Sequence, residues 1–176
     1  MKKYITGGWA VFKNYIFAMI FFYIFFIGFY SKAGLFSVLI FLVLVLLLYS
    51  EMAHRAGVDK RKYGRVQPID GVLYGAIAVA PVIVLQLVIL LLSFDLTVIN
   101  FETLKFNLIK GLAAPMLFIA RAGGYSVWGY AIAWAAIVLF SGLGYFAGYK
   151  GFDLNAYVRK LFGLQPRKVN TKKVRR

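Results

Sequence analysis

Long apolar runs separated by short polar segments dominate the chain, and four of these runs are long enough to cross a bilayer. A membrane-spanning helix needs about 20 predominantly apolar residues, because an α-helix rises only about 1.5 Å per residue. We therefore predict spans at residues 14–31, 35–50, 71–94 and 122–149. The pattern is typical of an all-α integral membrane protein, in this case a four-span helical bundle.

The first two spans are joined by a turn of only a few residues, which predicts a tight antiparallel hairpin. Residues 2–12 precede this hairpin and mix basic with aromatic side chains. We expect this segment to lie along the membrane interface, with Tyr4, Trp9 and Phe12 at headgroup depth. The polar loop 51–70 then links the first pair of spans to the second pair.

The segment 95–121 is expected on the outer side of the membrane, and it is too long for a simple turn. Apolar residues recur in it at helical spacing, which predicts an amphipathic helix on the outer surface. These residues are Phe101, Leu104, Leu108 and Leu112. The apolar piece 111–120 contains Pro115 and is too short to span. We interpret it as a re-entrant or surface-lying piece before the last span.

The distribution of basic residues predicts how the bundle is oriented. The chain has 21 Lys and Arg against six Asp and Glu, which gives a formal net charge of +15. Seventeen of the 21 fall before the first span, in the loop 51–70, or in the tail 150–176. Basic segments of this kind are retained in the cytoplasm during membrane insertion. We therefore expect both termini on the cytoplasmic side (N-in/C-in), with the protein in the plasma membrane.

The composition excludes several classes of protein. Hydrophobic residues make up 62% of the chain and its mean hydropathy is +0.77, whereas soluble domains are roughly 45–50% apolar. A soluble fold is therefore excluded. The chain contains no cysteine and one histidine, so disulfides, thiolate metal sites and histidine-rich metal centres are excluded as well.

A search for catalytic motifs finds none that is complete. Glu51 and His54 stand in the wrong order for a zinc-protease helix, and the second histidine is missing. Ser126 follows two glycines, but the predicted topology puts the single histidine at the opposite membrane face, too far away to activate it. The sequence has no glycine-rich phosphate loop. We therefore expect neither an enzyme nor a bound cofactor or metal.

Three residues within or beside the predicted spans are candidates for a functional role. Pro81 is expected to kink the third span, because proline removes an intrahelical hydrogen bond. Gln86 either joins helices through hydrogen bonds or contacts a substrate or ion at the kinked midpoint. Arg121 either snorkels to the outer headgroups or forms an anion-binding notch between Pro115 and the glycines at 123 and 124.

A charged triplet continues the second span helically beyond its apolar part. Glu51, His54 and Arg55 stand at i, i+3 and i+4 of a helix, a spacing that favours side-chain pairing. One interpretation is an interfacial helix end held by an ion pair. The other is a pH-sensitive latch, because histidine titrates near neutral pH.

Two glycine pairs suggest close helix packing. Gly71 and Gly75 open the third span, and Gly144 and Gly148 close the fourth span at the same membrane face. Small residues four apart let helix backbones approach closely in lipid. We predict that the two pairs meet, with Gly71 level with Gly148 and Gly75 level with Gly144.

The function expected from these patterns is that of a small non-enzymatic membrane subunit, which associates with itself or with a larger membrane complex. The absence of buried ionisable groups from the predicted spans supports this reading. The alternative is a small transporter or channel component with Pro81, Gln86 and Arg121 along its route. The expected partners are anionic headgroups of the bilayer and a membrane protein or second copy. We expect no specific nucleic acid, because membrane topology accounts for most of the basic charge.

Overall fold

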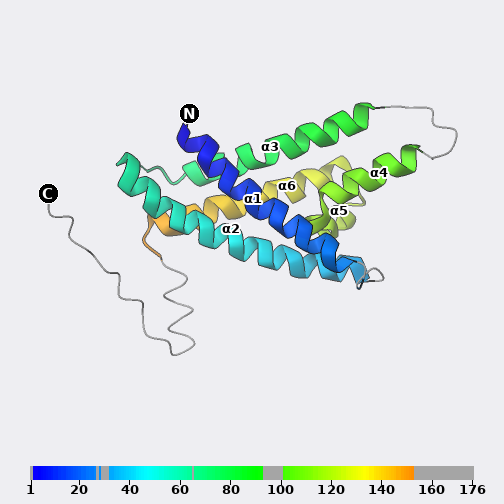
Figure 1. The fold of residues 1–176 in the computed structure, drawn as a ribbon, viewed down its shortest axis with the longest axis horizontal. Helices are drawn as coiled ribbons and strands as arrows, with labels where there is room; N and C mark the ends of the chain where they lie inside the picture. The colour runs from blue at the N-terminus through cyan, green and yellow to red at the C-terminus, as the bar shows by residue number, and fades with distance from the viewer. Residues whose placement is uncertain (1, 27, 29–31, 65, 93–100, 153–176) are drawn as a thin grey trace.

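A computed structural model describes residues 2–26, 28, 32–64, 66–92 and 101–152 of the chain (Figure 1). Helices are the regular elements formed by these residues, in agreement with the predicted all-α class. They are α1 (Lys2–Phe26), α2 (Ala33–Tyr63), α3 (Asp70–Leu91), α4 (Phe101–Leu112), the short 3₁₀ helix η2 (Ala114–Met116), α5 (Leu117–Ala122) and α6 (Val127–Tyr149).

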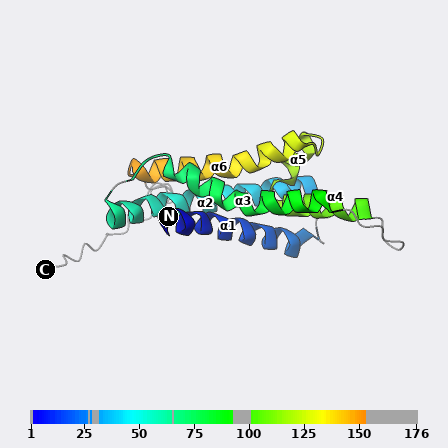
Figure 2. The same ribbon diagram turned by 90° about the horizontal axis from the view of Figure 1, so that it is seen from above.

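Four helices, α1, α2, α3 and α6, are long and apolar enough to cross a membrane. They lie side by side along the long axis of the molecule, and α2 and α3 each pack against both α1 and α6 (Figure 1 and Figure 2). The start of α1, the end of α2, the start of α3 and the end of α6 meet at one end of this bundle. We call this the basic end, and it includes Lys3, residues 60–64, residues 66–69 and Lys150.

The outside of the bundle is covered by large apolar side chains. Leu39, Val84 and Leu139 are all more than half exposed, and each represents a row of similar residues on its helix. Water would solvate such a surface poorly, whereas lipid tails match it. The surface therefore agrees with a multi-pass membrane protein.

Helix α1 begins earlier than the predicted first span. It is continuous from Lys2, and its first three turns are part of the bundle. Gly7 and Gly8 are buried against α3, where a Cβ on Gly7 would lie only 2.5 Å from the Tyr74 ring. The prediction that residues 2–12 lie along the interface is therefore wrong, because they form the first turns of a continuous α1 that packs against α3. Trp9 is more than half exposed on the outer side of this helix.

Helix α2 extends well beyond the predicted second span. Residues 51–63 continue it, so most of the predicted loop is helical. The helix ends where Gly64 adopts a left-handed conformation with φ 67°, and the Gly64 amide donates to the Lys60 carbonyl at 3.2 Å. Basic side chains in the last turn stabilise the negative end of the helix dipole.

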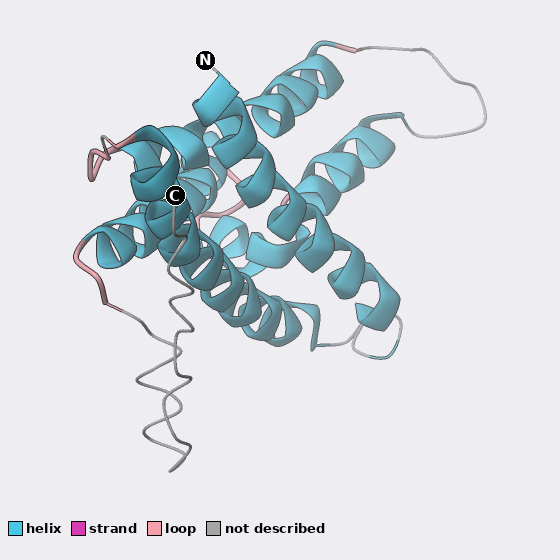
Figure 3. Cartoon of the chain, turned by 60° about the vertical axis from the view of Figure 1, so that its left-hand side comes forward, coloured by secondary structure: helices cyan, strands magenta, loops and turns pink. Residues whose placement is uncertain are grey.

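The short stretch between α4 and α5 is buried in the bundle. We call α4, η2 and α5 the bent segment, because α4 and residues 114–122 are bent by 77° (Figure 3). Ala113, Ala114 and Met116 are at most 2% exposed. The Ser37 hydroxyl of α2 donates to the Ala114 carbonyl at 3.1 Å and accepts from the Phe118 amide at 3.3 Å. The surface-lying alternative is therefore wrong for these residues.

The predicted helix in the segment 95–121 is present as α4. It turns a different face toward the bundle from the one predicted. Leu104 and Leu108 are exposed, whereas Ile109 is buried and Leu112 packs against the core. The reason is that α4 docks against α3, where the Ile109 carbonyl accepts a hydrogen bond. Tertiary contact, and not a membrane surface, therefore decides which side of α4 is inside.

The last long helix begins at Val127, five residues later than the predicted span. A turn through Gly123 and Gly124 precedes it, with Gly124 at φ 63°. Ser126 caps the helix, since its hydroxyl accepts from the Gly129 amide at 3.3 Å. Of the predicted tail 150–176, residues 153–176 lie outside the described part of the chain.

Candidate functional site

Two buried carboxylates lie at the basic end of the bundle, and Asp59 of α2 is the first of them. Its side chain is only 1% exposed. The hydroxyl of Tyr74 in α3 donates to Asp59 Oδ2 at 2.5 Å, and that of Tyr145 in α6 lies 3.1 Å from the same oxygen. Arg55, one turn earlier in α2, places Nε 3.6 Å from Oδ1. Asp59 therefore joins three helices through one carboxylate.

Asp70 is the second buried carboxylate, at the first residue of α3. Lys3 of α1 forms an ion pair with it at 2.6 Å, and the Tyr4 hydroxyl donates to its other oxygen at 3.2 Å. The Gln67 amide also donates to it, at 3.0 Å. Asp70 therefore attaches the start of α1 to the start of α3.

Tyr145 connects the two carboxylates into one cluster. Its hydroxyl lies 3.1 Å from Asp59 Oδ2 and 3.5 Å from Asp70 Oδ2, and its side chain is buried. A hydroxyl has a single proton, so it can donate to only one of the two at a time. We call Lys3, Tyr4, Arg55, Asp59, Asp70, Tyr74 and Tyr145 the carboxylate cluster.

The carboxylate cluster pairs charge with opposite charge. Burying an isolated carboxylate is very costly, so a buried ionised group needs a cation or several hydrogen bonds. Asp70 has both, from Lys3, Tyr4 and the Gln67 amide. Asp59 has two tyrosine hydroxyls and the longer Arg55 contact, and its Oδ1 has no hydrogen-bond partner within the described residues. The arrangement can therefore hold four helices together.

A second polar centre lies toward the opposite end, around Gln86 of α3. Its amide nitrogen donates to the Ile109 carbonyl of α4 at 3.4 Å, and its oxygen accepts from the Trp134 indole of α6 at 2.9 Å. An apolar cavity of about 190 Å³ adjoins it, with Leu87, Leu90 and Val127 among its walls. Both ends of the amide are therefore used in joining helices, as the first interpretation of Gln86 predicts.

The other two residues proposed for a route do not converge with Gln86. Pro81 is exposed on the outside of α3, and α3 continues through it as a single helix. Five residues separate Pro81 from Gln86, which places them on different sides of the helix. Arg121 is exposed, and its guanidinium approaches Gly34 at the start of α2.

The charged triplet at the end of the apolar part of α2 forms a different pair from the one expected. Arg55 pairs with Asp59, four residues later, and its side chain is largely buried. Glu51 is half-buried, and His54 is exposed on another side of the helix. Arg55 therefore belongs to the carboxylate cluster, whereas His54 lies on the surface.

The glycine pairs confirm close packing but correct the predicted register. A Cβ on Gly71 would lie 2.8 Å from the Ser141 carbonyl, and one on Gly75 would lie 2.7 Å from the Val138 backbone. The partner glycines face α2 instead: Gly144 lies against Tyr49, and Gly148 against Ala53. The predicted pairing of Gly71 with Gly148 and of Gly75 with Gly144 is therefore wrong.

Helix geometry explains this correction. Successive residues are rotated by about 100° around an α-helix, so Gly144 and Tyr145 cannot face the same neighbour. Tyr145 turns toward α3, where its ring packs edge-on against Tyr74 with 5.4 Å between ring centroids and its hydroxyl reaches Asp70. Gly144 and Gly148 are left to face α2, and the two glycine pairs serve two different interfaces.

The sequence interpretation missed both carboxylates of the cluster. It treated Asp59 and Asp70 as loop residues and expected no buried ionisable groups, which the structure contradicts. One signal was present, since Asp59 follows Arg55 by four residues, a favourable spacing on a helix. The contacts with Lys3, Tyr4 and Tyr145 join segments far apart in the sequence, and no local pattern indicates them.

Comparison with models of protein families, with curated proteins and with solved structures finds no match for this chain. No group of three or more His, Asp or Glu side chains that could hold a metal ion occurs in the described residues.

Proposed function

We propose that this protein is a small non-enzymatic membrane subunit that associates with itself or with a larger membrane complex. The observation that carries the proposal is the middle of the bent segment, residues 113–116, which is buried among the bundle helices where a conducting path would need space. Ala113 and Met116 within it are fully buried, and the Tyr15 hydroxyl of α1 donates to the Leu112 carbonyl.

The middle of the bundle is also filled. Between the carboxylate cluster and Gln86, the interior holds closely packed apolar side chains from several helices, including Val11, Ala78 and Ile137. Water and ions need polar groups along a route through a membrane. A solid bundle with a lipid-compatible surface is better suited to a structural or assembly role.

One observation favours the alternative, a small transporter or channel component. Asp59 and Asp70 are buried in helices long enough to span a membrane, and ionisable groups in such positions often mark ion or proton pathways. Their cationic and tyrosine partners offer a structural explanation of the same burial. A flux measurement separates the two functions.

The decisive experiment is cross-linking in the native membrane, followed by solubilisation in mild detergent and quantitative mass spectrometry. We expect a partner in fixed molar ratio to the chain, or a defined homo-oligomer. A parallel measurement follows proton and sodium flux in proteoliposomes that contain the purified chain. A monomer without a stoichiometric partner, together with flux that Asp59→Asn abolishes, would support the transporter instead.

The proposed location is the plasma membrane, with the basic end in the cytoplasm. The bias of basic residues toward this end supports that orientation. Because the chain has no cysteine, Lys62→Cys introduces a single thiol. We expect an impermeant maleimide to label it only after the cells are opened, whereas Lys32→Cys at the opposite end should be labelled in intact cells. Labelling of Lys62→Cys from outside would reverse the orientation.

A further inference from the structure

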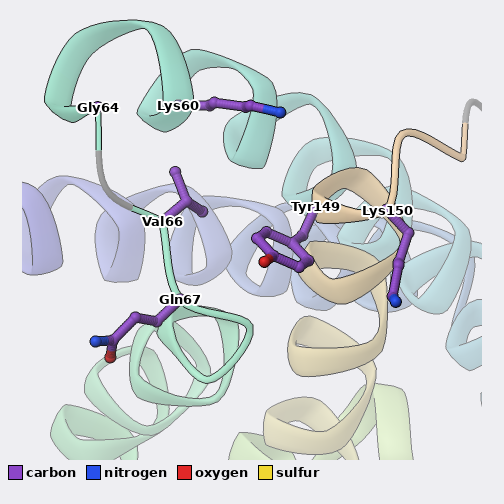
Figure 4. Close-up of a pocket in the computed structure, with 6 residues that line it drawn as sticks. All are labelled: Lys60, Gly64, Val66, Gln67, Tyr149 and Lys150. Carbon is purple, nitrogen blue, oxygen red and sulfur yellow. The ribbon is translucent and has the colours of Figure 1, made fainter.

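A pocket of about 620 Å³ opens at the basic end, between the end of α2, the connection to α3 and the end of α6 (Figure 4). Helix α2 contributes Lys60, and α6 contributes Tyr149 with Lys150 directly after it. Gly64, Val66 and Gln67 of the connection complete the wall. Three separate parts of the chain therefore build one open site.

The charge of this pocket is positive and is not balanced by its own wall. Lys60 and Lys150 bring two ammonium groups to it, and the six lining residues include no carboxylate. The nearest acidic residue in sequence, Asp59, is buried beside Arg55, Tyr74 and Tyr145. Two cations that share a pocket repel each other, and an anion bound between them removes this repulsion.

The rest of the wall provides a hydrogen-bonding group suited to a phosphate. Tyr149 carries a phenolic hydroxyl that lies on the pocket side of its ring, whereas the Gln67 side chain points away from Tyr149 and Lys150 (Figure 4). Phosphate oxygens accept hydrogen bonds from ammonium and hydroxyl donors. The lining therefore combines charge with a neutral donor.

The position of the pocket favours a lipid over a soluble anion. Below Lys150, residues Leu139, Leu143 and Phe146 follow at spacings of four, three and four along α6, so all four lie on one helix face. The three apolar residues are between 44% and 56% exposed. They form an open apolar strip about 10 Å long, which leads from the pocket along the side of the bundle.

We propose that this pocket binds the phosphate headgroup of an anionic phospholipid. Lys60 and Lys150 hold the phosphate, Tyr149 adds a hydrogen bond, and an acyl chain lies along Leu139, Leu143 and Phe146. The site is independent of the proposed subunit function, because it uses residues outside the carboxylate cluster and the bent segment.

The test measures the thermal stability of the full chain in nanodiscs of phosphatidylcholine, with increasing fractions of phosphatidylglycerol. A ligand that binds only the folded state raises the melting temperature in a concentration-dependent way. The double variant Lys60→Gln/Lys150→Gln removes both pocket cations. Its matched control is Lys2→Gln/Lys62→Gln, which removes the same charge at the same end from two exposed residues that do not line the pocket.

We expect phosphatidylglycerol to stabilise the wild type and the control equally. The pocket variant should need about thirtyfold more of this lipid for the same stabilisation, which corresponds to about 2 kcal/mol for the two lost lysine–phosphate contacts. All three proteins should melt together in pure phosphatidylcholine, which verifies that the variants fold. If the control variant lost as much stabilisation by phosphatidylglycerol as the pocket variant, the effect would be one of general charge, and the proposed binding site would be wrong.

A second arm separates the lipid from a soluble anion. Glycerol 3-phosphate carries the same phosphate chemistry without acyl chains, and it is added to the protein in phosphatidylcholine nanodiscs. We expect no stabilisation at concentrations where phosphatidylglycerol is effective, because the apolar strip is then unused. Equal stabilisation by glycerol 3-phosphate, lost in the pocket variant, would overturn the assignment to a lipid.

Discussion

The two ends of the bundle hold the same helices together by different physical means. At the basic end, Asp59 and Asp70 join α1, α2, α3 and α6 through ion pairs and tyrosine hydroxyls. Toward the opposite end, the contacts to the bent segment are neutral, through Ser37, Gln86 and apolar packing. Among the described residues, the ion pair that joins two helices, Lys3 with Asp70, is therefore at the basic end, whereas the buried hydrogen bonds that join helices toward the other end are uncharged.

This difference follows from the cost of burying charge. An ion in hydrocarbon is expensive, and the cost is lowest close to the membrane surface, where water and headgroups are near. Asp59 lies within the last five residues of α2 and Asp70 is the first residue of α3, so both carboxylates lie near helix ends. A neutral amide such as Gln86 needs only its hydrogen bonds, and it can lie deeper among apolar neighbours.

The largest expected effect is at Asp59. In Asp59→Leu, Arg55 loses its ion-pair partner and the Tyr74 and Tyr145 hydroxyls lose their acceptor. Breaking a buried ion pair on one side costs about 3–5 kcal/mol. We expect the free energy of unfolding in detergent to fall by this amount, as measured by denaturant titration.

Two variants sharpen this prediction. Glu51→Leu, two turns earlier in α2, is the control and should change stability far less, because no ion pair to Glu51 is found among the described residues. Adding Arg55→Met to Asp59→Leu should recover part of the loss. Equal effects at Glu51 and Asp59 would show that the carboxylate cluster does not hold the basic end.

The next largest effect is expected where backbones approach each other. In Gly75→Ala, the new methyl group meets the Val138 backbone of α6 at 2.7 Å, and overpacking of this kind costs about 1–3 kcal/mol. Gly57→Ala in α2 is the control, since its methyl group meets nothing within 4 Å. Alanine in an open helix position should stabilise by about 0.5–1 kcal/mol. Denaturant titration in detergent should show a lower free energy of unfolding for Gly75→Ala and a higher one for Gly57→Ala. A change of the same sign in both variants would contradict the close α3–α6 contact.

A smaller effect is expected at Gln86. Gln86→Leu removes the hydrogen bonds to the Trp134 indole and the Ile109 carbonyl, and polar contacts between membrane helices average roughly 0.6 kcal/mol each. We expect about 1 kcal/mol of destabilisation, with faster hydrogen exchange in α4 and unchanged exchange at the basic end. Val84→Leu, on the exposed side of α3, is the control. Faster exchange at both ends would show that the ends are not independent.

The smallest effect is expected at His54. Its side chain is exposed and lies outside the carboxylate cluster, so His54→Ala should change stability by less than about 0.5 kcal/mol. The dependence of the melting temperature on pH between 5 and 8 should match that of the wild type. If the melting temperature of the wild type depended on pH and this dependence disappeared in His54→Ala, the interpretation as a pH-sensitive latch would be supported.

The sequence by itself determined the all-α class, the four long apolar helices and the bias of basic residues toward one end. Each follows from properties that add up along a segment, namely hydrophobicity, length and charge. It also indicated Gln86 as a joint between helices, because an amide among apolar residues requires a partner. It placed Gly71 and Gly75 correctly at a close helix contact, although with the wrong partners.

Only the tertiary structure decided which residues meet. A single helix rotation turns Tyr145 toward Asp59 and Asp70, and Gly144 toward α2. The rotation of a helix that is apolar on all sides leaves no pattern in its sequence, because every face suits lipid equally well. For the same reason, the burial of the bent segment cannot be predicted from its sequence, because its apolar residues suit a membrane surface as well as a core. Packing among all the helices selects one arrangement, and with it the carboxylate cluster.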